Sequence, residues 1–192
     1  LVIIWLIIGN RKLKGKFNDT PYSVSVIVPI RNGEETLSDL INDLSLQNYY
    51  GKFEIILVDD NSDDNTLKII KSIVKRDNRF KYQTSNNGNP ALNFKKRALD
   101  AGIKVAKNEW LLFTDADCRL TIHWIAGMVS YFNAENDYVI GHSYVKRDRG
   151  ILNMFETIDL LLLLLCARGA VGNNYPLACI GQNQAYKKSL YH

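Results

Sequence analysis

Two patterns of apolar and polar positions follow one another along most of the chain. Short apolar runs occupy residues 23–30, 53–58 and 110–113, and a weaker run occupies residues 80–83. Runs of this length are typical of strands buried in the centre of a parallel sheet. Between them lie segments whose apolar residues recur every three or four positions, as on one face of a helix. This order predicts an α/β fold with a mostly parallel sheet flanked by helices.

The helical pattern is clearest in residues 34–47, where Leu37, Leu40 and Leu44 fall on one face. After the second strand, the polar residues Asn61 to Asp64 offer N-caps to a helix. The segments expected to form helices are 34–47, 65–75, 93–106 and 123–132, and a further strand is expected over 137–145.

Charged or polar residues follow three of the predicted strands at their carboxyl ends. They are Arg31-Asn32, Asp59-Asp60 and the pair Asp115 and Asp117. Ligands of open α/β sheets bind beyond the carboxyl ends of the strands. We therefore expect these side chains to contribute to one site.

The segment Phe113-Thr-Asp-Ala-Asp117 ends an apolar run with two carboxylates spaced two residues apart. In an extended chain this spacing directs both side chains to the same side. Two carboxylates on one side repel each other unless a cation or hydrogen-bond donors lie between them. A divalent cation with oxygen ligands, open to a diphosphate, suits this place. The alternative is a solvated loop that carries two acids.

The N-terminus is apolar from Leu1 to Ile8 and then basic. Four cations, Arg11, Lys12, Lys14 and Lys16, lie within six positions. A basic cluster after an apolar segment marks the cytoplasmic side of a membrane. We expect residues 1–16 to be the end of a transmembrane helix and its juxtamembrane segment, with the following domain in the cytoplasm. A buried N-terminal strand and a trimmed signal peptide are the alternatives.

A second strongly apolar segment, residues 151–168, contains six consecutive leucines. Glu156 and Asp159 interrupt it, so a buried or interfacial helix is favoured over a membrane span. The formal net charge of the 192-residue chain is only +4, and no basic stripe with aromatic residues indicates nucleic-acid binding. The three cysteines lack metal-type spacing and are typical of reduced thiols in the cytosol.

Four segments, in this order and spacing, resemble the motifs of family 2 glycosyltransferases of the GT-A fold. They are Val26-Ile-Val-Pro-Ile-Arg-Asn-Gly-Glu-Glu-Thr-Leu37, Glu54-Ile-Ile-Leu-Val-Asp-Asp-Asn-Ser62, Lys95-Lys-Arg-Ala-Leu-Asp-Ala-Gly102 and Leu111-Leu-Phe-Thr-Asp-Ala-Asp117. The likeness covers roughly residues 23–189. It implies a GT-A domain over residues 17–192, incomplete at its C-terminus.

The resemblance also implies roles for individual residues. The backbone from Pro29 to Arg31 would flank the nucleobase, within a nucleotide-binding loop that includes Glu34. Asp60 would accept a hydrogen bond from the base. Lys95 would offset phosphate charge, although it could equally be a solvated lysine on a helix face.

In the same family pattern, Asp115 would contact the ribose or the metal, and Asp117 would bind the Mg²⁺ or Mn²⁺ that bridges the phosphates. The segment from Cys179 to Lys188 is similar to the family's Gly-x-Asn motif, which places Gly181 and Asn183 on the donor-sugar and acceptor side. An ordinary turn before a strand is the alternative for that segment.

Two departures from the family pattern are visible. Phe94 stands where the family usually has a glycine before the lysine. No residue matches the acidic general base that inverting transfer needs, and we expect this base in a segment that follows His192.

Together these features predict the donor-binding part of a membrane-anchored, inverting glycosyltransferase. It would use a nucleotide-sugar, most simply a UDP-sugar, and modify a lipid-linked or envelope glycan. One alternative is a sugar-1-phosphate nucleotidyltransferase, which the acidic loop at Glu34 and Glu35 disfavours. Another is a non-catalytic GT-A-like module that binds a nucleotide or a partner protein.

Overall fold

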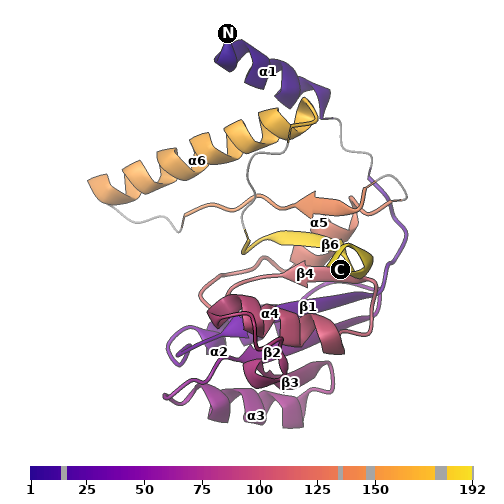
Figure 1. Cartoon of the computed structure of the whole chain (residues 1–192), viewed down its shortest axis with the longest axis vertical. Coiled ribbons are helices and arrows are strands. Elements are labelled where there is room, and N and C mark those ends of the chain that lie inside the picture. Colours follow the sequence, from indigo (N-terminus) through magenta and orange to yellow (C-terminus); the bar gives the residue numbers. More distant parts are fainter. Residues whose placement is uncertain (14–16, 134–135, 146–149, 176–180, 192) are drawn as a thin grey trace. The chain divides into compact units, whose positions relative to one another are not determined.

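The computed structural model describes residues 1–13, 17–133, 136–145, 150–175 and 181–191. The chain forms two compact units (Figure 1). The first comprises Leu1–Lys16 with Ile140–Asn183, and the second comprises Phe17–Val139 with Gln184–His192. The predicted division at residue 17 stays a prediction. Four residues that entered the sequence analysis, Lys14, Lys16, Cys179 and His192, lie outside the described residues.

A six-stranded sheet carries the fold, in the order β3-β2-β1-β4-β6-β5. Its strands are β1 (Val24–Ile30), β2 (Phe53–Asp59), β3 (Phe80–Thr84), β4 (Trp110–Phe113), β5 (Tyr138–Ile140) and β6 (Gln184–Lys187). The pairs β1–β2, β1–β4 and β2–β3 are parallel, whereas β4 and β6 are antiparallel. The predicted mostly parallel α/β sheet is thus confirmed. The strand expected over residues 137–145 is shorter, and β6 was not predicted.

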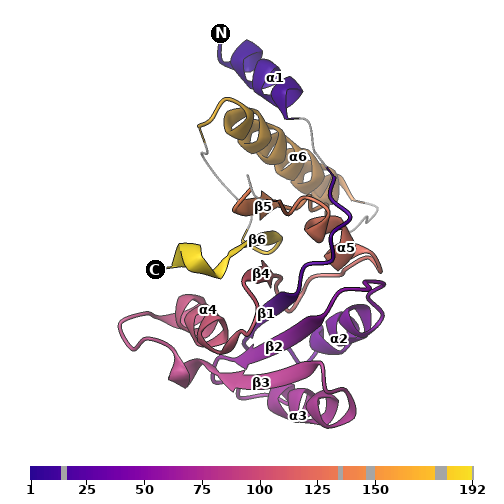
Figure 2. The same cartoon turned by 90° about the vertical axis from the view of Figure 1, so that its right-hand side faces the viewer.

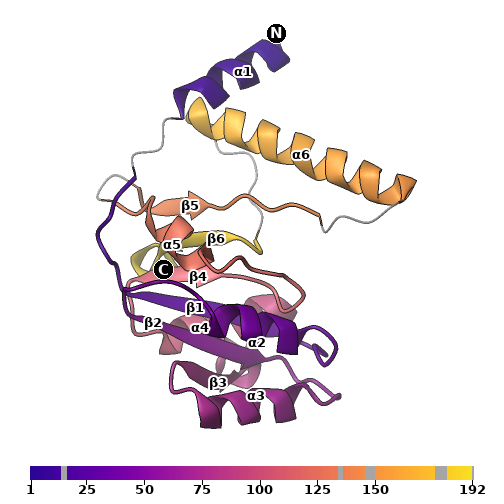
Figure 3. The same ribbon diagram turned by 180° about the vertical axis from the view of Figure 1, so that it is seen from behind.

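Helices cover both faces of the second unit's sheet. The helices of this unit are α2 (Leu37–Ser45), α3 (Thr66–Arg76), α4 (Phe94–Val105) and α5 (Trp124–Val129), with the 3₁₀ turns η1 (Ser85–Asn87) and η2 (Lys188–Tyr191). In β1, Val26 and Val28 pack in one buried cluster with residues of α2, α3 and α5, whereas Ile27 packs with α4. Figures 2 and 3 show α4 on the side of the sheet opposite to α2 and α3. The alternation of strand side chains thus produces three layers.

Helix α4 approaches the sheet closely at Gly102. A Cβ atom there would lie 2.6 Å from Ile27 Cγ2 and 3.0 Å from Val58 Cγ2. Because only glycine leaves room for this contact, Gly102 sets the depth at which α4 packs on β1 and β2. The same helix carries Lys95 in its first turn.

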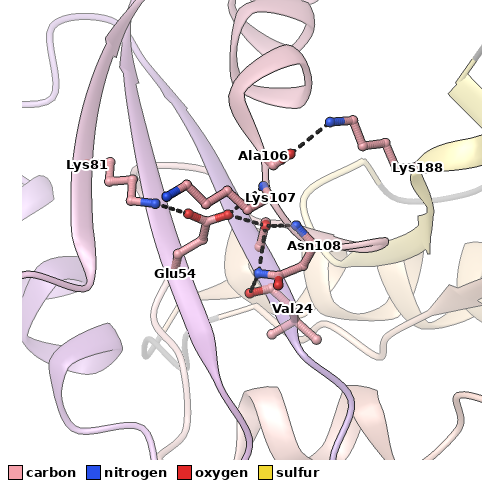
Figure 4. Close-up of polar contacts among 8 residues, drawn as sticks. Val24, Glu54, Lys81, Ala106, Lys107, Asn108 and Lys188 are labelled. Carbon is pink, nitrogen blue, oxygen red and sulfur yellow. Dashed lines mark hydrogen bonds and ion pairs between the residues drawn. The ribbon is translucent and has the colours of Figure 1, made fainter.

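A buried polar cluster joins the amino ends of the strands to the turn before β4 (Figure 4). The Glu54 carboxylate accepts hydrogen bonds from Ser25 Oγ and from the Lys107 backbone N–H, both at 2.7 Å, and forms an ion pair with Lys81. Asn108 Nδ2 donates to Ser25 Oγ at 3.1 Å. Burial by itself would raise the pKa of Glu54, but the hydrogen bonds from Lys81, Ser25 and Lys107 together lower it. Glu54 therefore stays ionised and connects β2 to β1, to β3 and to the turn before β4.

The first unit consists mainly of α1 (Val2–Lys12) and α6 (Ile151–Gly172). The two helices cross at small residues, because a Cβ atom on Gly9 would lie 1.8 Å from the Gly169 carbonyl oxygen. Asn173 Nδ2 donates to the Trp5 carbonyl at 2.7 Å. The predicted helix over residues 151–168 is confirmed and extends further. Among its residues only Gly169 and Ala170 are buried, so the helix is not a buried one, and the interfacial alternative stays a prediction.

The helices of the structure contradict the predicted membrane-anchored location. Helix α1 has 11 residues and ends in Arg11 and Lys12. At 1.5 Å per residue it is about 16 Å long, roughly half of the bilayer's hydrocarbon core. Within the described residues, neither α1 nor any other helix combines the length and the apolar character needed to cross a lipid bilayer. This finding contradicts the predicted membrane-anchored location and gives no support to membrane contact through the N-terminal helix. The assignment of residues 1–16 to the end of a transmembrane helix stays a prediction.

Candidate functional site

A cavity of about 740 Å³ opens at the carboxyl edge of β1, β2 and β4, within the second unit. Ile30 of β1 is opposite Asp59 of β2, and Ile27 of β1 is opposite Phe113 of β4, so the loops that follow these strands meet at one edge. The cavity is lined by seven of the residues predicted from the sequence, namely Pro29, Arg31, Glu34, Asp60, Lys95, Asp115 and Asp117. The structure thus brings the residues of four separate motifs together.

Lys95 and Asp115 form an ion pair in this cavity. Lys95 Nζ lies 2.6 Å from Asp115 Oδ1 and 2.7 Å from Oδ2. The lysine comes from the first turn of α4 and the aspartate from the loop after β4. Asp117, two residues further along this loop, is exposed. Of the two carboxylates that could hold a metal, one is therefore already neutralised by a lysine and the other is open to the cavity.

The two aspartates that follow β2 have different surroundings. Asp60 lines the cavity, and its backbone N–H donates to the Ile30 carbonyl at 2.8 Å, which fixes it against the end of β1. Asp59 instead accepts a hydrogen bond from the Ser62 backbone N–H at 3.3 Å. Asp60 is thus the aspartate of this pair that lines the cavity, and its contact with the nucleobase stays a prediction.

Glu34 lines the cavity but is bound to the neighbouring loop. Its carboxylate accepts hydrogen bonds from the Asn65 backbone N–H at 3.1 Å and from Asn65 Nδ2 at 2.6 Å. In return, the Glu34 backbone N–H donates to Asp64 Oδ2 at 3.0 Å. Hydrogen bonds from Thr66, to which the Glu34 N–H adds, hold the pKa of Asp64 below its usual value. Glu34 thus shapes the cavity by joining the loops after β1 and β2.

Residues 61–64 were expected only to cap a helix, and these hydrogen bonds between the two loops were not predicted. Three further features of the two loops support these contacts. The Gly33 N–H donates to Thr66 Oγ1 at 2.8 Å, and both Asn32 and Asn61 have positive φ angles, 51° and 54°. Asparagine tolerates this left-handed conformation better than most residues. Asparagines two residues after the ends of two parallel strands were the available signal for such tight turns.

The charge of the cavity lining is strongly negative. Six carboxylates line it, from Glu34, Glu35, Asp60, Asp64, Asp115 and Asp117, against the two cationic side chains of Arg31 and Lys95. A diphosphate would be repelled from this lining unless a cation accompanied it. No cluster of three or more metal-ligating side chains occurs in the described ranges. Mg²⁺ is commonly held by one or two carboxylates together with substrate phosphates and water, so Asp115 and Asp117 fit such an ion.

Gly181 and Asn183 belong to the first unit. Asn183 is buried, and its Nδ2 donates to the His142 carbonyl at 3.0 Å and to Ser143 Oγ at 3.3 Å. A Cβ atom on Gly181 would meet nothing within 4 Å, so local packing does not require glycine there. The role expected for this pair stays a prediction.

Comparison with known proteins agrees with this architecture. The chain is 33% identical over 122 residues to Glycosyltransferase GlyG of Streptococcus pneumoniae, a match that covers 63% of this chain and 39% of that protein. It is 28% identical over 133 residues to the GalNAc(5)-diNAcBac-PP-undecaprenol beta-1,3-glucosyltransferase of Campylobacter jejuni, covering 69% of this chain and 42% of that protein. The chain therefore spans about two fifths of the length of these relatives.

Solved structures show the same fold. The mannosyltransferase PcManGT of Pyrobaculum calidifontis, in complex with GDP-Man and Mn²⁺, superposes with a TM-score of 0.69 at 20% identity over 98% of this chain and 52% of that chain. Residues 1–349 of Staphylococcus aureus TarS, in complex with UDP, give a TM-score of 0.51 at 28% identity over 67% of this chain and 38% of that chain.

A family model covers most of the chain. The model described as Glycosyl transferase family 2 matches residues 25–191, which include all four motifs and the six strands apart from Val24. This match agrees with the GT-A neighbours and with the site at the carboxyl edge of the sheet. The chain therefore belongs to glycosyl transferase family 2.

Proposed function

We propose that this chain binds the donor of an inverting, metal-dependent glycosyltransferase that uses a UDP-sugar. The donor-binding domain corresponds to residues 17–192, and the acceptor is a glycan or a lipid-linked glycan. The observation that carries the proposal is the cavity in which Lys95, Asp115 and Asp117 meet the loops after β1 and β2. Its volume of about 740 Å³ lies within the usual range of small-molecule sites.

Metal dependence is supported by the charge of the cavity. Asp117 and Asp115 would hold Mg²⁺ or Mn²⁺, with the remaining positions left to phosphate oxygens and water. Such an ion, when bound, supplies Lewis-acid stabilisation of the negative charge that develops on the departing nucleoside diphosphate. Lys95 neutralises Asp115 at 2.6 Å. On donor binding, the lysine would become available to the phosphates.

The choice of UDP is supported by the TarS structure, which was solved with UDP and is 28% identical to this chain. Asp60 would accept a hydrogen bond from the base N–H, and the backbone from Pro29 to Arg31 would flank the ring. Glu34 would act indirectly, because both of its carboxylate oxygens accept hydrogen bonds from Asn65. The undecaprenol-linked acceptor named for the Campylobacter relative supports a lipid-linked acceptor. Gly181 and Asn183 would contribute on the acceptor side.

The proposal is tested by calorimetric titration of UDP, GDP and dTDP into the chain, with and without Mn²⁺. We expect UDP to bind only when Mn²⁺ is present, and Asp117→Ala to abolish this binding. Asp159→Asn removes an exposed acid of α6 and is the matched control, which should bind as the wild type does.

Preference for GDP would keep the family's donor chemistry but overturn the choice of UDP. Absence of binding by all three nucleotides, in a chain whose thermal unfolding is cooperative, would overturn the proposal and favour a module without a donor site. Equal binding with and without Mn²⁺ would overturn the metal site alone.

A further inference from the structure

The loop that carries Asp115 and Asp117 is held on both sides. On one side it follows β4, which ends at Phe113 and is paired in the sheet. On the other side it runs into residues 119–125, which pack along α2. Only residues 114–118 lie between these two supports. The position of the exposed Asp117 therefore depends on how firmly the second support is held.

The first contact of this support is a two-pronged ion pair. Arg119 Nε lies 2.7 Å from Asp43 Oδ2, and Arg119 Nη2 lies 3.0 Å from Asp43 Oδ1. Asp43 Oδ2 also accepts a hydrogen bond from the Leu120 backbone N–H at 3.0 Å. Arg119 Nη1 reaches Asp39, one turn earlier on α2, at 3.0 Å. A guanidinium bound at two points fixes direction as well as distance, which a lysine cannot do.

The second contact lies just beyond the C-terminal end of α2, which ends at Ser45. Gln47 Nε2 donates to the Thr121 carbonyl at 2.7 Å, and Gln47 Oε1 accepts from the Ile125 backbone N–H at 2.9 Å. The Asn48 N–H donates to the Ile122 carbonyl at 2.7 Å. Residues 119–125 are therefore bound along their length, first to α2 and then to Gln47 and Asn48, which follow it.

Helix α2 also borders the donor cavity. The residues directly before it, from Arg31 to Thr36, line the cavity. The N-terminal end of α2 thus supports the loop that is expected to flank the nucleobase. The side of the same helix supports the segment that follows Asp117. Asp43 is well covered, with 10% of its side chain exposed, whereas Arg119 is 57% exposed. The arginine is thus exposed to solvent and is held by the two acids of α2.

We propose that Asp43 and Arg119 are positioning residues that fix Asp117 for the metal-bound diphosphate. This inference rests on the proposed function. Neither residue has to touch the ligand, because the ion pair acts on the backbone two residues after Asp117. Residues that orient the ligands of a metal ion commonly change its affinity without being ligands themselves.

The test is a Mn²⁺ titration of the chain in saturating UDP, in the wild type, Arg119→Lys and Asp43→Asn. Arg119→Lys keeps the charge but loses the two-pronged geometry, and its exposed position makes misfolding a small risk. The matched control is Arg79→Lys, because Arg79 makes a similar two-pronged pair with Asp77, at 3.0 and 2.6 Å, away from the cavity. Thermal unfolding of all four proteins reports on general stability.

We expect the half-saturating Mn²⁺ concentration to rise about tenfold in Arg119→Lys and Asp43→Asn and to stay unchanged in Arg79→Lys. The affinity for UDP at saturating Mn²⁺ should change little in all of them. Unchanged Mn²⁺ dependence in both variants would overturn the inference, as would an equal shift in Arg79→Lys.

Hydrogen exchange separates this inference from the proposed function. In the chain without metal or nucleotide, the amides of residues 116–118 should exchange faster in Arg119→Lys than in Arg79→Lys. If the wild type binds no UDP, the proposed function fails. If the wild type binds UDP and these amides exchange equally in the two variants, only the positioning role fails.

Discussion

The Lys95 ammonium group lies within hydrogen-bond distance of both carboxylate oxygens of Asp115, at 2.6 and 2.7 Å. The two residues are 20 positions apart and come from the first turn of α4 and the loop after β4. Half of the lysine side chain is exposed, so this pair is worth little as a stabilising contact. Under the proposed function its significance is electrostatic, because Asp115 would bind the metal ion and Lys95 would bind a phosphate.

Lys95→Met should therefore change the affinities for metal and for nucleotide in opposite directions. Without the lysine, Asp115 and Asp117 attract a divalent cation more strongly, so Mn²⁺ alone should bind at least as tightly as in the wild type. UDP in the presence of Mn²⁺ should bind about tenfold more weakly, because a charge-assisted contact to phosphate is lost. Calorimetry with each ligand measures both effects.

Lys96→Met is the control for this experiment, since it removes a neighbouring positive charge that does not line the cavity. It should leave both affinities close to those of the wild type. A parallel loss of Mn²⁺ and UDP binding in Lys95→Met would contradict the competition between Lys95 and the metal.

Glu54→Gln should lower the free energy of unfolding at neutral pH, and this free energy should then depend less on pH in the acid range. The pKa of Glu54 is below its ordinary value of 4.5, so its stabilising contribution is fully present above that value. The contribution is lost as the pH falls below 4.5 through the lower pKa of the folded state. Loss of charge-assisted hydrogen bonds should cost about 2 kcal/mol at neutral pH. The gap between the two proteins should close in acid.

Urea unfolding at neutral pH and at about pH 3 measures this gap. Glu156→Gln removes an exposed glutamate of α6 and controls for the loss of one charge. A gap between wild type and Glu54→Gln that is constant with pH would show that the ionisation of Glu54 does not contribute.

Phe94→Gly should stabilise the chain. Phe94 has a φ angle of 51°, a left-handed conformation that is unfavourable for a residue with a Cβ atom. Its side chain is 73% exposed, so its removal gives up little buried surface. After the extra chain entropy of glycine is subtracted, we expect a gain of about 0.5–1 kcal/mol. Thermal unfolding measures it.

The matched variant is Phe94→Ala, which also removes the ring but keeps a Cβ atom at the same φ angle. It should show no comparable gain. Equal stabilisation by alanine and glycine would mean that the ring, rather than the backbone conformation, is unfavourable at this position.

Gly102→Ala should destabilise the second unit. The added methyl group would lie 2.6 Å from Ile27 Cγ2, in a core where these atoms have no room to move. Overpacking of this kind costs about 1–3 kcal/mol, which exceeds the gain in helix propensity. Gly127→Ala is the matched control, because a Cβ atom on Gly127 in α5 meets nothing within 4 Å. Chemical denaturation should show a loss for the first variant and a small gain or no change for the second.

Much of the second unit could be predicted from its sequence. The strands at residues 24–30, 53–59 and 110–113 were recognised because a buried parallel strand is apolar throughout, which is a local property of the sequence. The carboxyl ends of these strands predicted where the cavity lies, because the carboxyl ends of parallel strands meet at one edge of the sheet. Asp60, Asp115 and Asp117 were found in this way.

Other features depended on contacts between distant parts of the chain. Helix α5 ends earlier than the pattern of apolar residues indicated. Strand β6 was not expected, because a strand of four residues is recognisable mainly through its partner in the sheet, here β4. The contact of the 11-residue helix at the N-terminus with α6, at Gly9, was likewise not visible in the sequence.

The sequence by itself thus determined the order of strands and helices from β1 to β5, the mostly parallel sheet and the edge at which the acidic residues gather. These follow from periodicity and composition, which act over a few residues. Only the tertiary structure decided that Glu34 binds Asn65, that Lys95 neutralises Asp115 and that Arg119 is fixed by Asp43. Each of these contacts joins side chains at least 20 residues apart, so it exists only after the packing of helices on the sheet has brought two loops or a loop and a helix together.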